Sequence, residues 1–151
     1  MFGIKERREL IAKLEEHRLG LMEIVATLDE KAGNTPLKPG DRSPKGQLLH
    51  VWETEHRYVW DWAKRARDED SPDLSERDLG ATGEAHLFEP ANEMTLAMLV
   101  DHLNQERALT YRFIAETSDE EMDRVGRNTP FGDLTVHQFL KSLYRHDQMH
   151  Q

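Results

Sequence analysis

The feature of the sequence that most restricts the fold is the recurrence of apolar residues at helical spacing. Over residues 3–31 they recur three, four or seven positions apart with charged residues between them, the pattern of a helix with one buried face. The apolar positions in this segment are Ile4, Ile11, Leu14, Leu21, Val25 and Leu28. We therefore predict a first long helix over residues 3–31, which the GNTP sequence at residues 33–36 ends.

Three further helices are predicted. The second covers residues 44–67, with Ser43 as its N-cap and a proline at its first helical position, where the missing N–H costs nothing. The third covers residues 92–117. The fourth begins after Thr135, whose spacing to Gln138 is that of a capping box.

The segments between these helices carry weaker patterns. Residues 68–91 form a long connection, in which we expect at most a short helical turn over residues 74–79. A capping-box sequence at residues 118–121 predicts another short turn, and residues 128–132 are predicted to be a loop. No segment alternates cleanly as a strand does. We predict one domain over residues 1–151, an all-α four-helix bundle with a long crossover between its second and third helices.

The composition excludes several kinds of protein. The 151 residues contain no cysteine, which excludes disulfides, thiolate metal ligands and a cysteine nucleophile. The net charge of −9 argues against nucleic-acid binding, which needs a basic face. The longest apolar run, at residues 96–100, is too short for a membrane span, and residues 1–8 do not resemble a signal peptide. We expect a cytoplasmic protein without membrane or nucleic-acid partners.

Two of the eight histidines extend the apolar face of the fourth helix. Val136, Phe139, Leu143, His146 and His150 follow a 3-4-3-4 spacing, so all five lie on one face. Two imidazoles four residues apart on a helix can bind one metal ion. About 0.4 such pairs are expected by chance from this composition, so the pair alone is a weak signal. Two partly buried histidines held by hydrogen bonds are an alternative.

A catalytic zinc site usually has three protein ligands and one open position, so a third ligand would come from another helix. His137 points away from the apolar face, and His17 and His102 are most simply solvated. His86 lies in the long connection. The other candidates are His50 and His56 on the second helix. Periodicity predicts an exposed His50 and an aromatic-packed His56, and it does not choose between them.

Three segments resemble motifs of a known family. Residues 48–55 (LLHVWETE) look like the second-helix motif of the DinB-like (DinB/YfiT) superfamily, a histidine among apolar residues followed by acids. Residues 145–151 (RHDQMHQ) resemble its closing His-x-x-x-His motif, and residues 131–135 (FGDLT) its turn before the last helix. The resemblance covers nearly the whole chain and implies the same four-helix fold.

The resemblance also implies a metal site. In this family one histidine of the second helix and two of the fourth bind a divalent ion, commonly zinc or nickel, and the matching residues here are His50, His146 and His150. The chain departs from the family pattern at Arg42, where a tryptophan is usual. It also ends one residue after His150, and we expect either that the last helix continues in the natural protein or that its final turn is frayed.

The function implied by the resemblance is an enzyme that acts on small molecules. Some family members transfer low-molecular-weight thiols to electrophiles, and this is the activity that we expect, with a thiol as cosubstrate, in detoxification or stress response. A hydrolase that uses metal-bound hydroxide and a non-catalytic metal-binding module are alternatives. The family also implies a homodimer, for which the tryptophans of the second helix offer an apolar surface.

Two acids are candidates for acid–base catalysis. Glu53 lies one turn after His50, and Asp147 follows His146 and could orient it. The simpler interpretation of both is a solvated helix charge. Arg107 occupies an apolar position of the third helix, where we expect it to pair with Glu55 rather than to bind an anionic substrate.

Overall fold

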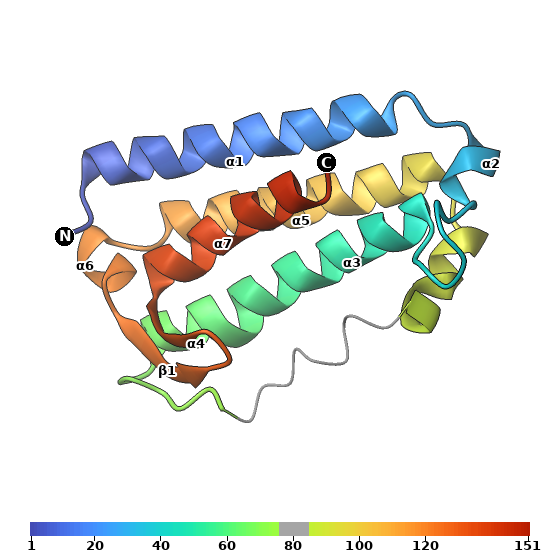
Figure 1. Cartoon of the computed structure of the whole chain (residues 1–151). Helices are drawn as coiled ribbons and strands as arrows, with labels where there is room; N and C mark the ends of the chain where they lie inside the picture. Colours follow the sequence, from blue (N-terminus) through green and yellow to red (C-terminus); the bar gives the residue numbers. More distant parts are fainter. Residues whose placement is uncertain (76–84) are drawn as a thin grey trace.

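Four long helices form the body of the protein in the computed structural model, which describes residues 1–75 and 85–151 (Figure 1). They are α1 (Ile4–Val25), a continuous helix made of α3 (Pro44–His56), the π-helical η1 (Arg57–Ala63) and α4 (Lys64–Asp68), then α5 (Leu96–Ala115) and α7 (Val136–Met149). A long connection joins α4 to α5, so the predicted all-α bundle and its crossover are confirmed. No helix of the described residues is long and apolar enough to cross a membrane.

The predicted starts of the second and fourth helices are confirmed by their hydrogen bonds. The Ser43 hydroxyl accepts a hydrogen bond from a backbone N–H of the first turn of α3, at 3.1 Å. The Thr135 hydroxyl accepts from the Gln138 N–H at 3.1 Å, and the Gln138 side chain accepts in return from the Thr135 N–H at 2.9 Å. A capping box of the same kind opens the short helix α6 (Asp119–Met122).

The first helix is shorter than predicted. It ends at Val25 rather than near residue 31, and a separate turn, α2 (Glu30–Gly33), follows. The Asp29 carboxylate accepts a hydrogen bond from the Ala32 N–H at 2.7 Å. Asp29 therefore starts a new helical turn instead of continuing the old one, which is the usual competition between a short polar side chain and the helix backbone.

The third helix begins later than predicted. Residues 92 and 93 belong to the 3-10 helix η3 (Ala85–Glu93), and α5 starts at Leu96. The Thr95 hydroxyl caps α5 by accepting from the Met98 N–H at 3.1 Å. The apolar pattern continues across this boundary, so it did not reveal where the helix type changes.

A β-hairpin replaces the loop that was predicted over residues 128–132. Strands β1 (Val125–Thr129) and β2 (Gly132–Thr135) pair in antiparallel fashion. They are too short for alternation to be visible in the sequence. The backbone of Leu74 bonds to Arg127 of β1, so the long connection is fixed to the hairpin at its start. Most of the helical turn predicted over residues 74–79 lies outside the described residues.

The apolar core is divided into two clusters along the bundle. On α1, Leu14 belongs to one cluster and Leu21 to the other, and the buried Arg18 lies between them. On α3 and α5, Glu55 and Arg107 hold the same intermediate position. The layer that separates the clusters is therefore built from charged side chains.

This layer is an ion network with one residue from each long helix: Arg18, Glu55, Arg107 and Asp147. Each is at most 6% exposed. Arg18 lies 2.8 Å from Glu55 and 3.0 Å from Asp147, and Arg107 lies 3.0 Å from Glu55 and 2.9 Å from Asp147. The predicted pairing of Arg107 with Glu55 is confirmed. The interpretation of Asp147 as a solvated charge is wrong, because its carboxylate is needed to neutralise two buried guanidinium groups.

The charges in this network stabilise one another. Burial alone would raise the pKa of Glu55, but the charges of Arg107 and Arg18 outweigh it and hold this pKa below its usual value. Burial alone would lower the pKa of Arg107, and Glu55 and Asp147 raise it instead. The Thr110 hydroxyl donates a further hydrogen bond to Glu55 at 2.7 Å. Glu55 and Arg107 are therefore ionised at neutral pH.

We predict that Glu55→Gln lowers the free energy of unfolding by about 3–5 kcal/mol, because it leaves a buried positive charge without compensation. Urea denaturation followed by circular dichroism measures this change. The matched control is Glu16→Gln, because the exposed Glu16 lies 3.7 Å from Lys13. The control should change stability by less than about 0.5 kcal/mol. Equal losses in the two variants would show that the network does not hold the helices together.

Candidate metal centre

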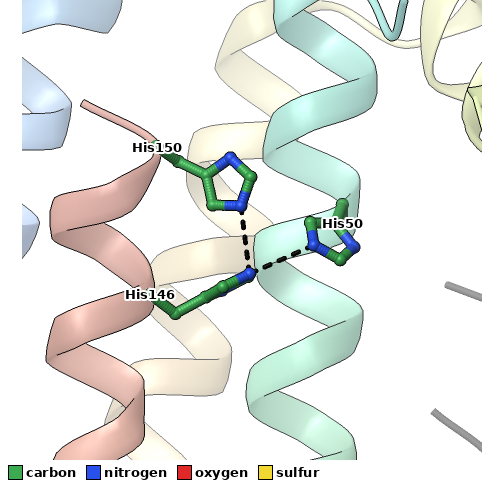
Figure 2. A group of neighbouring side chains, drawn as sticks. All are labelled: His50, His146 and His150. Atoms are coloured by element: carbon green, nitrogen blue, oxygen red, sulfur yellow. Dashed lines mark hydrogen bonds between the residues drawn. The ribbon is translucent and has the colours of Figure 1, made fainter. Parts of the chain in front are cut away.

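The structure brings together the three histidines that the family motif marks. His50 comes from α3, His146 from the last turns of α7, and His150 is the C-cap residue that directly follows α7. Their rings point toward one another (Figure 2). The Nε2 atom of His146 lies 3.1 Å from that of His50 and 3.0 Å from that of His150. Each histidine thus offers its Nε2 atom to one point between α3 and α7.

The buried ion network sets the rotation of α7 that makes this possible. Asp147 lies between His146 and His150 in the sequence and is bound by Arg18 of α1 and Arg107 of α5. Val136 and Leu143 of the same helix are buried in the core. With these contacts fixed, the two histidines are directed toward α3.

His50 is buried, against the expectation from periodicity. The buried face of α3 also carries Thr54 and Glu55, two polar residues whose burial an apolar pattern does not predict. The prediction for His56 is wrong in the opposite direction. It was expected in the core, but its side chain is 52% exposed and its Nδ1 atom lies 2.9 Å from Glu106. The polar network, which the apolar pattern does not show, explains both differences.

The three imidazoles are held in their neutral form. Burial, followed by the charges of Arg42 and His150, lowers the pKa of His50 to about 4. Burial and then the two neighbouring histidines lower the pKa of His146 to about 3. Burial and Arg42 also lower the pKa of His150. A neutral imidazole has a free lone pair, which is the form that binds a metal ion.

The residues present fit a tetrahedral divalent ion. Two nitrogens bound about 2.0–2.1 Å from a zinc ion at the tetrahedral angle lie about 3.3 Å apart, close to the observed separations. Hydrogen bonds between the imidazoles explain the close approach of the three Nε2 atoms less well than a bound ion does. The Nε2 atom of a neutral His146 carries either one hydrogen or one lone pair, yet it has two nitrogen neighbours at hydrogen-bond distance. The candidate ligand atoms of the three residues all lie within 4.8 Å of one another.

The other histidines whose side chains the structure describes do not join this group. His17 stacks on Tyr144 with ring centres 5.7 Å apart, and His137 packs against Phe2 at 4.7 Å. His102 is exposed beside Trp52. The backbone of residue 86 belongs to η3, and its side chain lies outside the described part of the structure.

The two predicted acids have different surroundings. Glu53 is half-buried on α3, and no ion pair joins it to another described residue. Asp147 is buried, and both of its carboxylate oxygens are bound by guanidinium groups. Asp147 is therefore placed to hold the orientation of α7. Catalytic roles for Glu53 and Asp147 stay predictions.

Two cavities reach the histidines from different sides. One of about 650 Å³ is lined by His50 and His150, and another of about 370 Å³ is lined by His146 and Tyr58. Both sizes lie within or close to the range of small-molecule sites, about 300–1,000 Å³. Met149, at the end of α7, lines both cavities. A small molecule would lie beside His50 and His150 in the larger cavity and beside His146 in the smaller one.

Comparisons with known proteins agree with the four-helix fold. The family model of the DinB superfamily matches residues 13–151. Among solved structures, the chain is similar to YfiT from Bacillus subtilis, with a TM-score of 0.69 and 19% identity over 99% of this chain and 84% of that chain. YfiT is described as "a probable metal-dependent hydrolase with an unusual four-helix bundle topology". At this identity the similarity shows the fold. No curated protein matches the sequence.

The lowered pKa values predict that the metal-free protein loses stability as the pH falls from 6.5 toward 4. In this window the unfolded chain protonates its histidines, whereas His50 and His146 in the folded chain stay neutral. The unfolded state therefore binds more protons and is favoured. For His50, the loss between pH 7 and pH 5 is about 2 kcal/mol.

Urea denaturation of the metal-free protein at pH 7 and pH 5 measures this loss. His50→Gln should reduce the difference between the two pH values, and His17→Gln, which removes a histidine outside the group of three, is the matched control. A pH dependence that is the same in His50→Gln and in the wild type would show that His50 does not have a lowered pKa.

Proposed function

The chain belongs to the DinB superfamily, and we propose that it is a metal-dependent enzyme that binds a divalent ion through His50, His146 and His150. The observation that carries this proposal is the approach of three neutral Nε2 atoms to one point beside two cavities. Three nitrogen ligands without a carboxylate favour zinc or nickel over magnesium or calcium. Three protein ligands also leave a coordination position for a substrate, as in catalytic zinc sites.

The protein residues have separate tasks in this proposal. When bound, the ion would lower the pKa of a water molecule or a thiol, so that a nucleophile forms at neutral pH. The three histidines contribute no negative charge, so they leave the full charge of the ion available. Arg18 and Arg107 hold Asp147 and with it the orientation of His146. Glu53, one turn from His50, is our candidate for accepting the proton of the nucleophile.

We further propose thiol transfer to an electrophile as the reaction. Because the chain has no cysteine, the sulfur must come with a cosubstrate. Hydrolysis is the second candidate, and the description of YfiT as a probable metal-dependent hydrolase favours it. The two reactions need the same metal ligands and differ in whether a thiol is consumed.

We predict that the purified protein, freed of metal by a chelator, binds one equivalent of zinc or nickel and that its melting temperature rises on binding. Isothermal titration calorimetry and a thermal melt measure both effects. His50→Ala and His146→Ala should each weaken binding by about 100-fold or more, because each removes a direct ligand. His17→Ala is the control and should bind as the wild type does. Binding of less than a tenth of an equivalent would refute the proposal.

The zinc-loaded protein also distinguishes the two reactions. For thiol transfer, loss of 1-chloro-2,4-dinitrobenzene should require an added low-molecular-weight thiol, release chloride and disappear in His146→Ala. For hydrolysis, p-nitrophenyl acetate should be cleaved at the same rate with and without thiol. If the loaded protein accelerates neither reaction beyond its His146→Ala variant with any added low-molecular-weight thiol, the ion has a structural or sensing role.

The homodimer implied by the resemblance stays a proposal. Trp62 is buried in the core, whereas Trp52 and Trp60 are only partly buried and leave apolar surface on the second long helix. Sedimentation equilibrium distinguishes a mass of 17.6 kDa from twice this value.

A further inference from the structure

The larger cavity beside the histidines combines an apolar wall with a cationic side chain. Its volume is about 650 Å³, and it extends from His50 and His150 to the end of α1. Leu21, Ile24 and Val25 of α1 form part of the wall. Arg42 and Gln47, at the start of α3, bring polar groups to the same cavity.

Arg42 has unused hydrogen-bonding capacity. Its Nη1 atom is buried and has no hydrogen-bond partner, and no ion pair joins Arg42 to any described carboxylate. Asp41 lines the cavity as well, but it is exposed. The guanidinium lies 5.4 Å from the centre of the Phe88 ring, and this contact restricts its position. Arg42 as a whole is half-buried, and its guanidinium is partly removed from water without a compensating partner. A ligand whose acceptor atoms reach this guanidinium would therefore be favoured there.

Gln47 gives a second, independent observation. Its side-chain oxygen is also buried without a partner. Gln47 and Arg42 line the same cavity, so two unsatisfied polar side chains accompany the apolar wall. This combination of an apolar cavity with a few polar groups is typical of small-molecule sites.

We propose that this cavity binds the substrate of the histidine site, and that this substrate is a small molecule with an apolar body and an anionic group bound by Arg42. The proposal rests on the proposed function, because the substrate is placed there by its contact with His50 and His150. The anion is recognised by direct contact, because the net charge of −9 does not attract anions from a distance.

A pair of fluorescent probes tests the charge preference. One is 8-anilinonaphthalene-1-sulfonate, and the other is N-phenyl-1-naphthylamine, which has the same rings without the sulfonate. Both are titrated into the full chain with and without zinc. Arg42→Met should weaken sulfonate binding about 10- to 100-fold, the size expected for a hydrogen bond to a charged group, and leave the neutral probe within about twofold.

Two further variants make the result specific. Arg42→Lys keeps the charge and should retain most of the sulfonate affinity. This variant also tests the proposal if Arg42→Met does not fold. Arg8→Met removes an exposed arginine of α1 that lines neither of the two cavities beside the histidines, and it should have no effect. Equal binding of the sulfonate to Arg42→Met and wild type, or equal losses for the two probes, would overturn the proposal.

The test of the anion site and the test of the metal site can fail independently of each other. Sulfonate binding to the metal-free protein should survive His146→Ala, which removes a metal ligand outside this cavity. Zinc binding should in turn survive Arg42→Met. A protein that binds the sulfonate through Arg42 but no metal would refute the metal site alone. A protein that binds zinc but shows no dependence on Arg42 would refute the anion site alone.

Discussion

The buried ion network of Arg18, Glu55, Arg107 and Asp147 is the constraint on which the rest of the structure depends. Each long helix contributes one charge, and each charge pairs with residues of two other helices. Apolar packing tolerates small rotations of a helix, because one aliphatic side chain can replace another in a contact. A buried guanidinium does not, because any rotation that breaks its hydrogen bonds leaves a charge without compensation. The network therefore selects one relative rotation of the four helices, at the level where the two apolar clusters meet.

The position of the histidine group follows from this selection. Asp147 belongs to the network, and His146 precedes it on α7, so the orientation that satisfies Asp147 also directs His146 toward α3. His50 lies five residues before Glu55, the network residue of α3, and is placed by the same contacts. The site thus has two structural layers: three imidazoles that face one another, and behind them a set of charges that cannot rearrange cheaply. Such support from residues that do not touch the ligand is common in metal sites.

Much of this could be predicted from the sequence, and the parts that could not share one cause. The caps at Ser43 and Thr135 and the apolar face of α7 follow local rules, and the structure confirms them. The burial of His50, the exposure of His56 and the burial of Asp147 depend on polar side chains that are buried because they meet partners far away in the sequence. Periodicity counts such residues as solvent-facing. The hairpin was missed for a different reason, since four- and five-residue strands are too short to show alternation.

The charge of the site also connects the metal to the proposed substrate. Arg42 is close enough to the histidines to lower the pKa of His50, His146 and His150, so it would also repel a bound dication. None of the three candidate ligands carries a negative charge that offsets this repulsion. An anionic group on Arg42 would offset it, and binding free energies are reciprocal. The anion should therefore bind more tightly when the ion is present, and the ion more tightly when the anion is present. Through this coupling, a substrate that carries the matching charge would complete the site.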